Sequence, residues 1–237
     1  MTRRRWIADE VNDNRAALTG AHATHLSRTL RAQIGQEFEV VCGDLVRRAV
    51  VASVNDARVE FELGSEIASS PTTPITLLLA VFKFDRMEWA IEKCTELNVS
   101  SIVPMITHRT EKHLAQAAQK RVERWRRIAL QASEQARRVA PPEIGDPVKL
   151  IEALQTLSQL RIVLAETERD PHLSSILRER VDPSSLALAV GPEGGWTDDE
   201  LQLFEKAGWI SASLGATILR AETASIVAVA IARNGIA

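Results

Sequence analysis

The first third of the chain has short apolar runs of the kind that form β-strands. They are rich in Val, Phe and Leu, and the turn pairs Gly43-Asp44 and Asn55-Asp56 separate them. The predicted strands are residues 38–42, 46–54 and 58–63. A segment with helical spacing, residues 22–32, precedes them. This mixture predicts a small β-barrel-like module rather than a βαβ unit.

Residues 69–74, Ser-Ser-Pro-Thr-Thr-Pro, interrupt every periodic pattern. We place a domain boundary there, which gives domains of residues 1–70 and 71–237. In the second domain, buried-strand runs alternate with helical patterns. The predicted strands are residues 75–82, 101–106, 161–165, 186–190 and 209–214, and the predicted helices are residues 85–97, 111–139, 171–180, 198–207 and 222–234. This alternation is typical of an α/β fold with a parallel sheet covered on both sides.

Several helix ends have their own signals. Asp85 has N-cap spacing ahead of Glu88, and Thr197 with Glu200 has the spacing of a capping box. Asn98 is expected to end the helix of residues 85–97, because asparagine tolerates the left-handed conformation.

Two glycine-centred loops carry the most functional information. Residues 191–195 read Gly-Pro-Glu-Gly-Gly, and residues 214–223 read Leu-Gly-Ala-Thr-Ile-Leu-Arg-Ala-Glu-Thr. Each follows an apolar run and precedes a helical pattern, so both lie where strands give way to helices. Open α/β sheets bind ligands at this edge, and glycine lets the main chain approach a ligand closely. We therefore expect one site assembled from separate loops.

Composition and charge exclude several classes of protein. The formal net charge of −2 argues against coating of nucleic acid by bulk attraction, although residues 71–150 have an excess of Lys and Arg that allows a local basic surface. Cys42 and Cys94 are far apart in apolar surroundings, so two reduced, buried thiols are expected. The five histidines are scattered, and no metal site is expected. No apolar run is long enough to cross a bilayer, so we expect a cytoplasmic protein.

Familiar sequence motifs of other enzymes are missing. The chain contains no G-x-G-x-x-G, G-x-x-x-x-G-K-[ST], G-x-S-x-G or H-E-x-x-H pattern. A classical dinucleotide fold, a P-loop protein, a serine hydrolase and a zincin are therefore disfavoured.

The two glycine loops together resemble the signature of the RsmE family, RNA methyltransferases of the SPOUT class. The resemblance extends over nearly the whole chain. His25-Leu26 with Leu30-Arg31 and Gly35 resembles the family's amino-terminal PUA-like domain, and Lys83, residues 96–99 and Glu134-Gln135 with Arg138 match its middle. The family methylates N3 of a uridine in small-subunit (16S) ribosomal RNA with S-adenosylmethionine. It also implies a PUA-like β-barrel domain, a SPOUT-type parallel sheet with a carboxy-terminal trefoil knot, and a homodimer.

By this resemblance, three loops form the cofactor site in the knot. The residues expected to bind S-adenosylmethionine are Glu166, Thr167, Gly191, Glu193, Gly194, Gly195, Leu214, Gly215, Leu219, Arg220 and Thr223. Arg220 is expected to hold the base or its phosphate and to stabilise negative charge on the uracil oxygens. Glu222 is a candidate acceptor of the N3 proton, and a structural carboxylate in the first turn of the last helix is an equal alternative.

The RNA itself must be held by positive side chains outside the reacting centre. The candidate contacts are Arg3, Arg4, Arg5, Arg28 and Arg31 in the first domain and Lys83 and Arg138 in the second. For any single arginine, a solvated surface position is the simpler interpretation.

The sequence departs from the family pattern at two positions. Asn98 stands where the family usually has Gly, and Thr217 stands where it commonly has Arg, so one positive charge near the site is missing. This missing charge supports one alternative, a non-catalytic RNA-binding protein that keeps the fold. A second alternative is an enzyme that uses the glycine loops for a phosphorylated small molecule.

Overall fold

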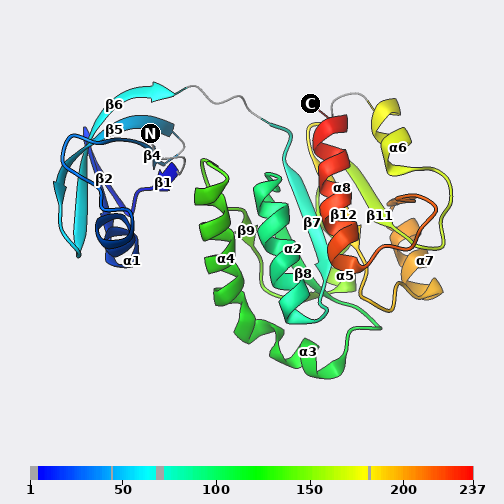
Figure 1. Ribbon diagram of the computed structural model, residues 1–237. Coiled ribbons are helices and arrows are strands. Elements are labelled where there is room, and N and C mark those ends of the chain that lie inside the picture. Colours follow the sequence, from blue (N-terminus) through cyan, green and yellow to red (C-terminus); the bar gives the residue numbers. More distant parts are fainter. Residues whose placement is uncertain (1–4, 44, 68–71, 181–182, 237) are drawn as a thin grey trace. The chain divides into compact units, whose positions relative to one another are not determined.

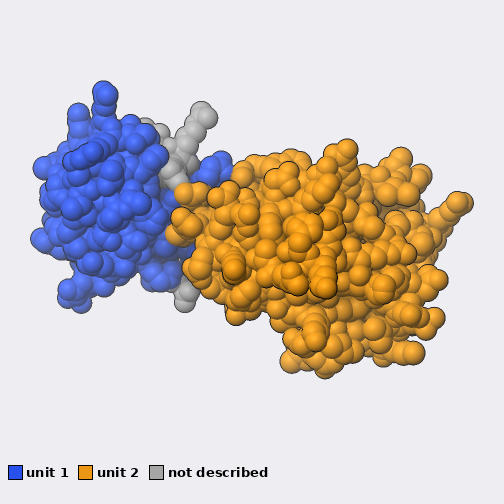
Figure 2. Space-filling model, turned by 90° about the horizontal axis from the view of Figure 1, so that it is seen from below, with its two compact units in different colours: residues 1–71, 133–141 blue, residues 72–132, 142–237 orange. Residues whose placement is uncertain are grey.

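The computed structural model describes residues 5–43, 45–67, 72–180 and 183–236 (Figure 1). The chain forms two compact units. The small unit comprises Met1–Pro71 with Ser133–Pro141, and the large unit comprises Thr72–Ala132 with Pro142–Ala237 (Figure 2). The sequence did not predict that residues 133–141 pack with the small unit. The boundary at residue 70 lies outside the described residues and stays a prediction.

The small unit is built on a curled six-stranded sheet with the order β1-β4-β5-β6-β3-β2 (Figure 1). Its strands are β1 (Arg5–Ile7), β2 (Glu10–Asn12), β3 (Arg15–Thr19), β4 (Glu37–Cys42), β5 (Leu45–Val54) and β6 (Arg58–Ile67). β1 pairs with β4 in parallel, and the other neighbours are antiparallel. Trp6, Leu18 and Phe61 are buried in its core. The predicted barrel-like module is therefore confirmed, although sequence reasoning missed the first three strands.

The helical segment of the small unit is shorter than predicted. Residues 22–32 were expected to form one helix, but α1 (Gly20–Thr24) passes into a π-helical turn (His25–Thr29) and stops there. Arg31 adopts a φ of 51°, a left-handed conformation that a continuing helix cannot contain.

The large unit contains a parallel sheet with the order β10-β8-β7-β12-β11-β13, and β9 also pairs with β8. Its strands are β7 (Ile75–Ala80), β8 (Ser101–Ile106), β9 (Glu143–Ile144), β10 (Val148–Lys149), β11 (Leu160–Leu164), β12 (Leu186–Val190) and β13 (Ile210–Ala212). All these pairs are parallel, as predicted. β12 is buried along its whole length, because helices cover both faces of the sheet.

Helices cover the two faces unequally. One face packs against α2 (Phe84–Glu96), α3 (Lys112–Ala117), α4 (Val122–Gln135), α6 (Leu173–Glu179) and α8 (Ala221–Gly235). The other packs against α5 (Leu150–Ala153) and α7 (Asp198–Lys206). Alternate residues along one strand serve the two cores, as Leu77 and Leu78 show. The sheet is therefore a rigid base for the loops at its carboxyl edge.

Two helix predictions were wrong in detail. The single helix predicted over residues 111–139 is divided into α3 and α4 by a tighter 3₁₀ turn (Ala118–Arg121), which re-phases the apolar face so that Leu114 and Trp125 reach the same core. Asp85 is not an N-cap. α2 begins one residue earlier, Lys83 is its N-cap, and Asp85 lies in the first turn, where the helix dipole favours a carboxylate.

Two other helix ends agree with the sequence. Asn98 has a φ of 64° directly after α2. Thr197 accepts a hydrogen bond from the backbone N–H of Glu200, whose carboxylate accepts one from the N–H of Thr197. Glu200 also accepts a hydrogen bond from the N–H of His108 over 2.7 Å. This capping box therefore joins the start of α7 to the loop after β8.

Candidate functional site

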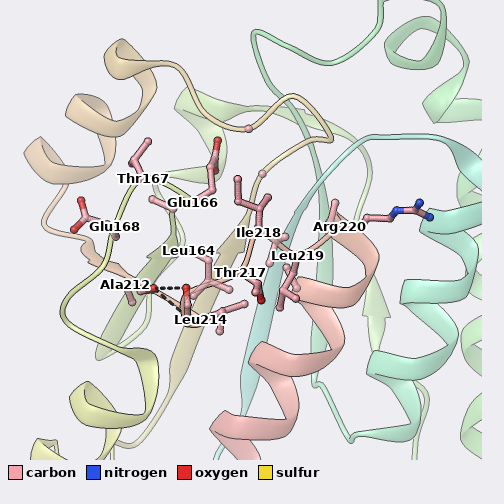
Figure 3. Close-up of a pocket in the computed structure, with 18 of the residues that line it drawn as sticks. Leu164, Glu166, Thr167, Glu168, Ala212, Leu214, Thr217, Ile218, Leu219 and Arg220 are labelled. Atoms are coloured by element: carbon pink, nitrogen blue, oxygen red, sulfur yellow. Dashed lines mark hydrogen bonds between the residues drawn. The ribbon is translucent and has the colours of Figure 1, made fainter.

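Three loops of the large unit enclose a cavity of about 1160 Å³ at the carboxyl ends of β11, β12 and β13 (Figure 3). Sequence reasoning named ten residues that line it: Glu166, Thr167, Gly191, Glu193, Gly194, Gly195, Leu214, Gly215, Leu219 and Arg220. Thr217, which stands in place of the family's arginine, also lines the cavity. The fold thus brings together loops that are separated by about 50 residues in the sequence.

Main-chain hydrogen bonds hold the loops beside one another. The N–H of Ala165 donates to the carbonyl of Ala212 over 3.1 Å. The N–H of Ser213 donates to the carbonyl of Pro171, and the carbonyl of Ser213 accepts from the N–H of Leu173. Two main-chain hydrogen bonds therefore join Ser213 to the segment that follows β11. These bonds fix the two side walls of the cavity without using the side chains that line it.

Gly191 lines the cavity where the glycine loop turns, and Trp196 packs against it outside the lining. A Cβ atom added to Gly191 would lie 3.0 Å from Cε2 of the Trp196 ring. That ring is buried, and its Nε1 donates a 2.8 Å hydrogen bond to the carbonyl of Leu164. Because this hydrogen bond holds the indole, an added Cβ would press against the ring, which favours glycine at position 191. Sequence reasoning did not single out Trp196.

Gly195 accommodates a side chain from the neighbouring loop. Its φ of 71° suits glycine, and an added Cβ would lie 1.6 Å from Oε1 of Glu166. The carboxylate of Glu166 therefore occupies the space that a side chain at position 195 would take. This packing holds an exposed carboxylate at the cavity wall, where Glu168 adds a second one.

Two arginines that the sequence analysis did not name lie against the glycine loop. Arg109, from the loop after β8, donates from Nη1 to the carbonyl of Gly194. Arg86, in the first turn of α2, lines the cavity, and its Nη1 donates a 2.5 Å hydrogen bond to Oε1 of Glu193. Arg86 follows β7, which lies next to β12 in the sheet, and Arg109 follows β8, which lies next to β7. The spacing of Arg86 three residues after Lys83 at a strand end was the available signal.

Glu222 and Thr223 are not among the described residues that line the cavity. Glu222 is 5% exposed, and its Oε2 has no hydrogen-bond partner. Its Oε1 lies 3.9 Å from Nε of Arg86. The carboxylate therefore faces an arginine that lines the cavity and does not face the cavity itself.

Arg220 is the N-cap residue of α8, and it caps no backbone group with its side chain. Figure 3 shows its side chain pointing away from the loops that carry Glu166 and Leu214. No described carboxylate lies within ion-pairing distance of it, although it belongs to the cavity wall. The amino end of α8 is thus open, with unsatisfied N–H groups near the cavity.

The predicted RNA contacts lie in different environments. Arg3 and Arg4 are outside the described residues. Arg5 forms a 2.9 Å ion pair with Glu39, and Arg28 forms a 2.7 Å ion pair with Asp56, which raises the pKa of the arginine and lowers that of Asp56. Arg31 and Lys83 are exposed, and Arg138 is half-buried.

Among the described ranges, no group of His, Cys, Asp and Glu side chains could hold a metal ion. No helix in the described part of the chain is long and apolar enough to cross a membrane. Burial raises the pKa of the Cys94 thiol to about 12, so this cysteine is not a nucleophile at neutral pH.

Comparisons with known proteins agree with this architecture. A family model described as an RNA methyltransferase domain matches residues 68–233. The ribosomal RNA small subunit methyltransferase E of a Synechocystis strain is 34% identical over 94% of this chain and 74% of its own length. The protein of the same name from Mesomycoplasma hyopneumoniae is 28% identical, with coverage of 94% and 95%.

Two solved structures are similar over nearly their full length. A ribosomal RNA small subunit methyltransferase E from Neisseria gonorrhoeae, bound to S-adenosyl methionine, has a TM-score of 0.85, 29% identity and coverage of 96% and 95%. A putative methyltransferase from Legionella pneumophila with bound cofactor SAM has a TM-score of 0.82, 27% identity and coverage of 97% and 96%. The predicted SPOUT-type fold class is confirmed, and its trefoil knot stays a prediction of the resemblance. The matching family model, the relatives and the fold together show that this chain belongs to the RsmE family of ribosomal RNA small subunit methyltransferases.

Proposed function

We propose that this protein transfers a methyl group from S-adenosylmethionine to N3 of one uridine in small-subunit (16S) ribosomal RNA. The observation that carries the proposal is the cavity at the carboxyl ends of β11, β12 and β13, in a chain whose family and fold match structures with this cofactor bound. The methylated atom is inferred from the resemblance in the sequence.

The residues present suit the cofactor. The molecule carries an adenine, a carboxylate, an ammonium group and a sulfonium ion. Main-chain groups around Gly191 and Gly215 can approach a flat base closely, because neither position has a side chain. Carboxylates of Glu166 and Glu168 on the wall match the positive charges. A cavity of about 1160 Å³ also leaves room for part of a nucleotide.

Methyl transfer places one demand on geometry and one on protonation. When bound, S-adenosylmethionine supplies the methyl group, whose bond electrons stay with sulfur as the N3 lone pair forms the new bond. The site must hold the nitrogen in line with that bond, so positioning is a large part of the catalysis. N3 must also lose its proton, and negative charge then develops on the uracil oxygens.

Arg220 and Glu222 are the residues that the sequence assigns to this chemistry. We propose that Arg220 neutralises charge on the base or its phosphate, since no described carboxylate pairs with it. Single-turnover methylation tests both roles. A wild-type rate for Arg220→Ala would remove Arg220 from the mechanism, and a wild-type rate for Glu222→Gln would remove the proton-acceptor role of Glu222.

Positive side chains would hold the rest of the RNA. Arg31 and Lys83 are exposed and remain candidates, whereas Arg5 and Arg28 are already paired with carboxylates. Several phosphate contacts would make RNA binding fall steeply with salt concentration. A homodimer and a cytoplasmic location are further parts of the proposal, taken from the family resemblance and the ribosomal substrate.

Mass spectrometry of ribosomal RNA provides the direct test. Small subunits from cells that lack this protein should be without one N3-methyluridine, and the purified protein with S-adenosylmethionine should restore it. Calorimetry separates the alternatives. Binding of RNA without S-adenosylmethionine would indicate a non-catalytic RNA-binding protein, for which Thr217 is the supporting observation, and binding of neither would overturn the proposed function.

A further inference from the structure

One basic and two acidic side chains meet at the edge of the cavity. Arg86 comes from the first turn of α2, Glu193 from the loop after β12, and Glu222 from the first turn of α8. Nη1 of Arg86 bonds Oε1 of Glu193 over 2.5 Å, and Nε of Arg86 lies 3.9 Å from Oε1 of Glu222. One guanidinium therefore connects three elements that surround the cavity.

The three side chains differ in exposure. Arg86 and Glu193 are about one-third exposed, at 32% and 29%, whereas the side chain of Glu222 is 7% exposed. Arg86 and Glu193 line the cavity, and Glu222 lies behind them. A substrate in the cavity would thus meet the arginine before it could meet Glu222.

The hydrogen-bonding capacity of this cluster is only partly used. Nη2 of Arg86 makes no hydrogen bond to any described residue, and Oε2 of Glu222 also has no partner. A buried carboxylate is costly unless a positive charge compensates for it. Among the described residues, Arg86 is the cation within 4 Å of Glu222. Arg86 therefore compensates for the buried charge of Glu222, and its Nη2 group remains available to donate to a ligand.

In the described part of the chain, no other charged group forms an ion pair with Glu222. β7 and β12, which pack against α8, contribute no charged side chain. α6 contributes Arg178 and Glu179, which are both exposed and form no ion pair with Glu222. Arg220 lies two residues before Glu222 on the chain, and its side chain points away from the cavity loops (Figure 3).

We propose that Arg86 is a substrate-binding residue that contacts the uracil oxygens of the target uridine, and that buried Glu222, with Glu193, positions it. Negative charge spreads onto those oxygens when N3 gives its proton to water in the cavity. A fixed guanidinium stabilises that charge most strongly in the transition state. In this arrangement Glu222 acts through Arg86 and accepts no proton. The inference rests on the proposed function.

Single-turnover methylation of small ribosomal subunits from cells lacking the protein tests the role of Arg86. Arg86→Met should lower the rate constant by about 10²-fold or more, the effect of removing one transition-state donor. Arg86→Lys, which keeps the charge but loses the planar fork, should be intermediate. Dissociation constants for S-adenosylmethionine, measured by calorimetry, should stay within about twofold of wild type in both variants, given the size of uniform-binding effects.

A double-mutant cycle tests the role of Glu222. If Glu222 acts only by positioning Arg86, then the combination of Arg86→Met with Glu222→Gln should be no slower than Arg86→Met alone. A proton acceptor would behave differently. Its removal would slow the reaction further in the Arg86→Met background, and it would abolish the acidic limb of the pH–rate profile. Either result would overturn the positioning role.

A second arginine–glutamate pair that involves α2 provides a matched control. Glu88 of α2 pairs with Arg124 of α4 over 2.7 Å, away from the cavity. Arg124→Met removes an arginine from a glutamate pair, as Arg86→Met does, and should leave the methylation rate unchanged. Wild-type methylation together with full activity of Arg86→Met would reject this inference alone. Absence of N3-methyluridine with the wild-type protein would reject the proposed function.

Discussion

Helices α2 and α8 pack side by side, and an arginine connects them at each end of the pair. At the amino ends, Arg86 of α2 reaches Glu193 and Glu222 beside the cavity. At the carboxyl ends, Arg233 of α8 donates to the carbonyls of Thr73, Leu97 and Asn98. The first arginine contacts two carboxylate side chains, and the second donates hydrogen bonds to three main-chain carbonyls.

This difference separates a structural arginine from one available for binding. Arg233 is half-buried, burial lowers its pKa, and each of its guanidinium nitrogens has an acceptor. Two of the carbonyls that it satisfies, those of Leu97 and Asn98, directly follow the last residue of α2, where a cation is favourable. Arg86 keeps unused donors and lines a cavity. The carboxyl ends therefore hold the helix pair together, while the amino ends can respond to a ligand.

Substitution of Arg233 should produce the largest change in stability. Arg233→Met leaves three partly buried carbonyls without donors. At about 1 kcal/mol for each, the lower end of the range for a buried group, we expect the free energy of unfolding to fall by roughly 3 kcal/mol. Urea unfolding monitored by tryptophan fluorescence measures this change. Arg86→Met should cost less, because its hydrogen-bonded pair with Glu193 is partly exposed and its contact with buried Glu222 is 3.9 Å long. Equal losses in the two variants would contradict the comparison.

Substitution of Gly191 tests the packing of the cavity wall, which lies near the amino ends of α2 and α8. Gly191→Ala places a methyl group against the fixed indole of Trp196 and should cost about 1–3 kcal/mol of stability, with weaker binding of S-adenosylmethionine. Gly145→Ala is the control, because its added Cβ would make ordinary contacts at 3.8 Å or more. Thermal unfolding and calorimetry report the two effects. A fully stable Gly191→Ala variant with normal binding would show that the indole can move.

Much of this comparison was visible in the sequence, but only where local rules apply. Asn98 could be assigned to the end of α2, and Thr197 with Glu200 to the start of α7, because those signals depend on residues within one turn. The parallel sheet followed from alternating apolar runs. The glycine loops could be placed at its carboxyl edge for the same reason.

The remaining features depend on contacts between distant residues. Arg86 and Glu193 are 107 residues apart, and no periodic pattern records that they meet. The break between α3 and α4 depends on how Leu114 and Trp125 fit one core. Glu222 was named because of its motif, but its burial behind Arg86 follows from the packing of α8 on α2. Tertiary packing decided each of these cases.

Arg220 offers a smaller test at the amino end of α8. This helix has no side-chain cap, and Arg220 already has the extended conformation of an N-cap residue, with φ −65° and ψ 153°. Arg220→Ser should therefore raise stability by about 0.5–1 kcal/mol, because serine can accept a hydrogen bond from the open N–H groups. The same change should slow methylation if Arg220 binds substrate. Thermal unfolding and single-turnover rates, measured together, show whether stability is exchanged for activity here.

The smallest perturbation uses the cysteine of α2 as a reporter. Cys94 is fully buried near the carboxyl end of the helix, so a thiol reagent can modify it only when this end opens. In a Cys42→Ala background at pH 8, Arg233→Met should speed its labelling, whereas Arg86→Met should leave the labelling rate close to that of the parent protein. Labelling that accelerates equally in both variants would mean that the pair opens as one unit. The distinction between a structural and a responsive end would then be lost, because local opening free energies would not differ along the helices.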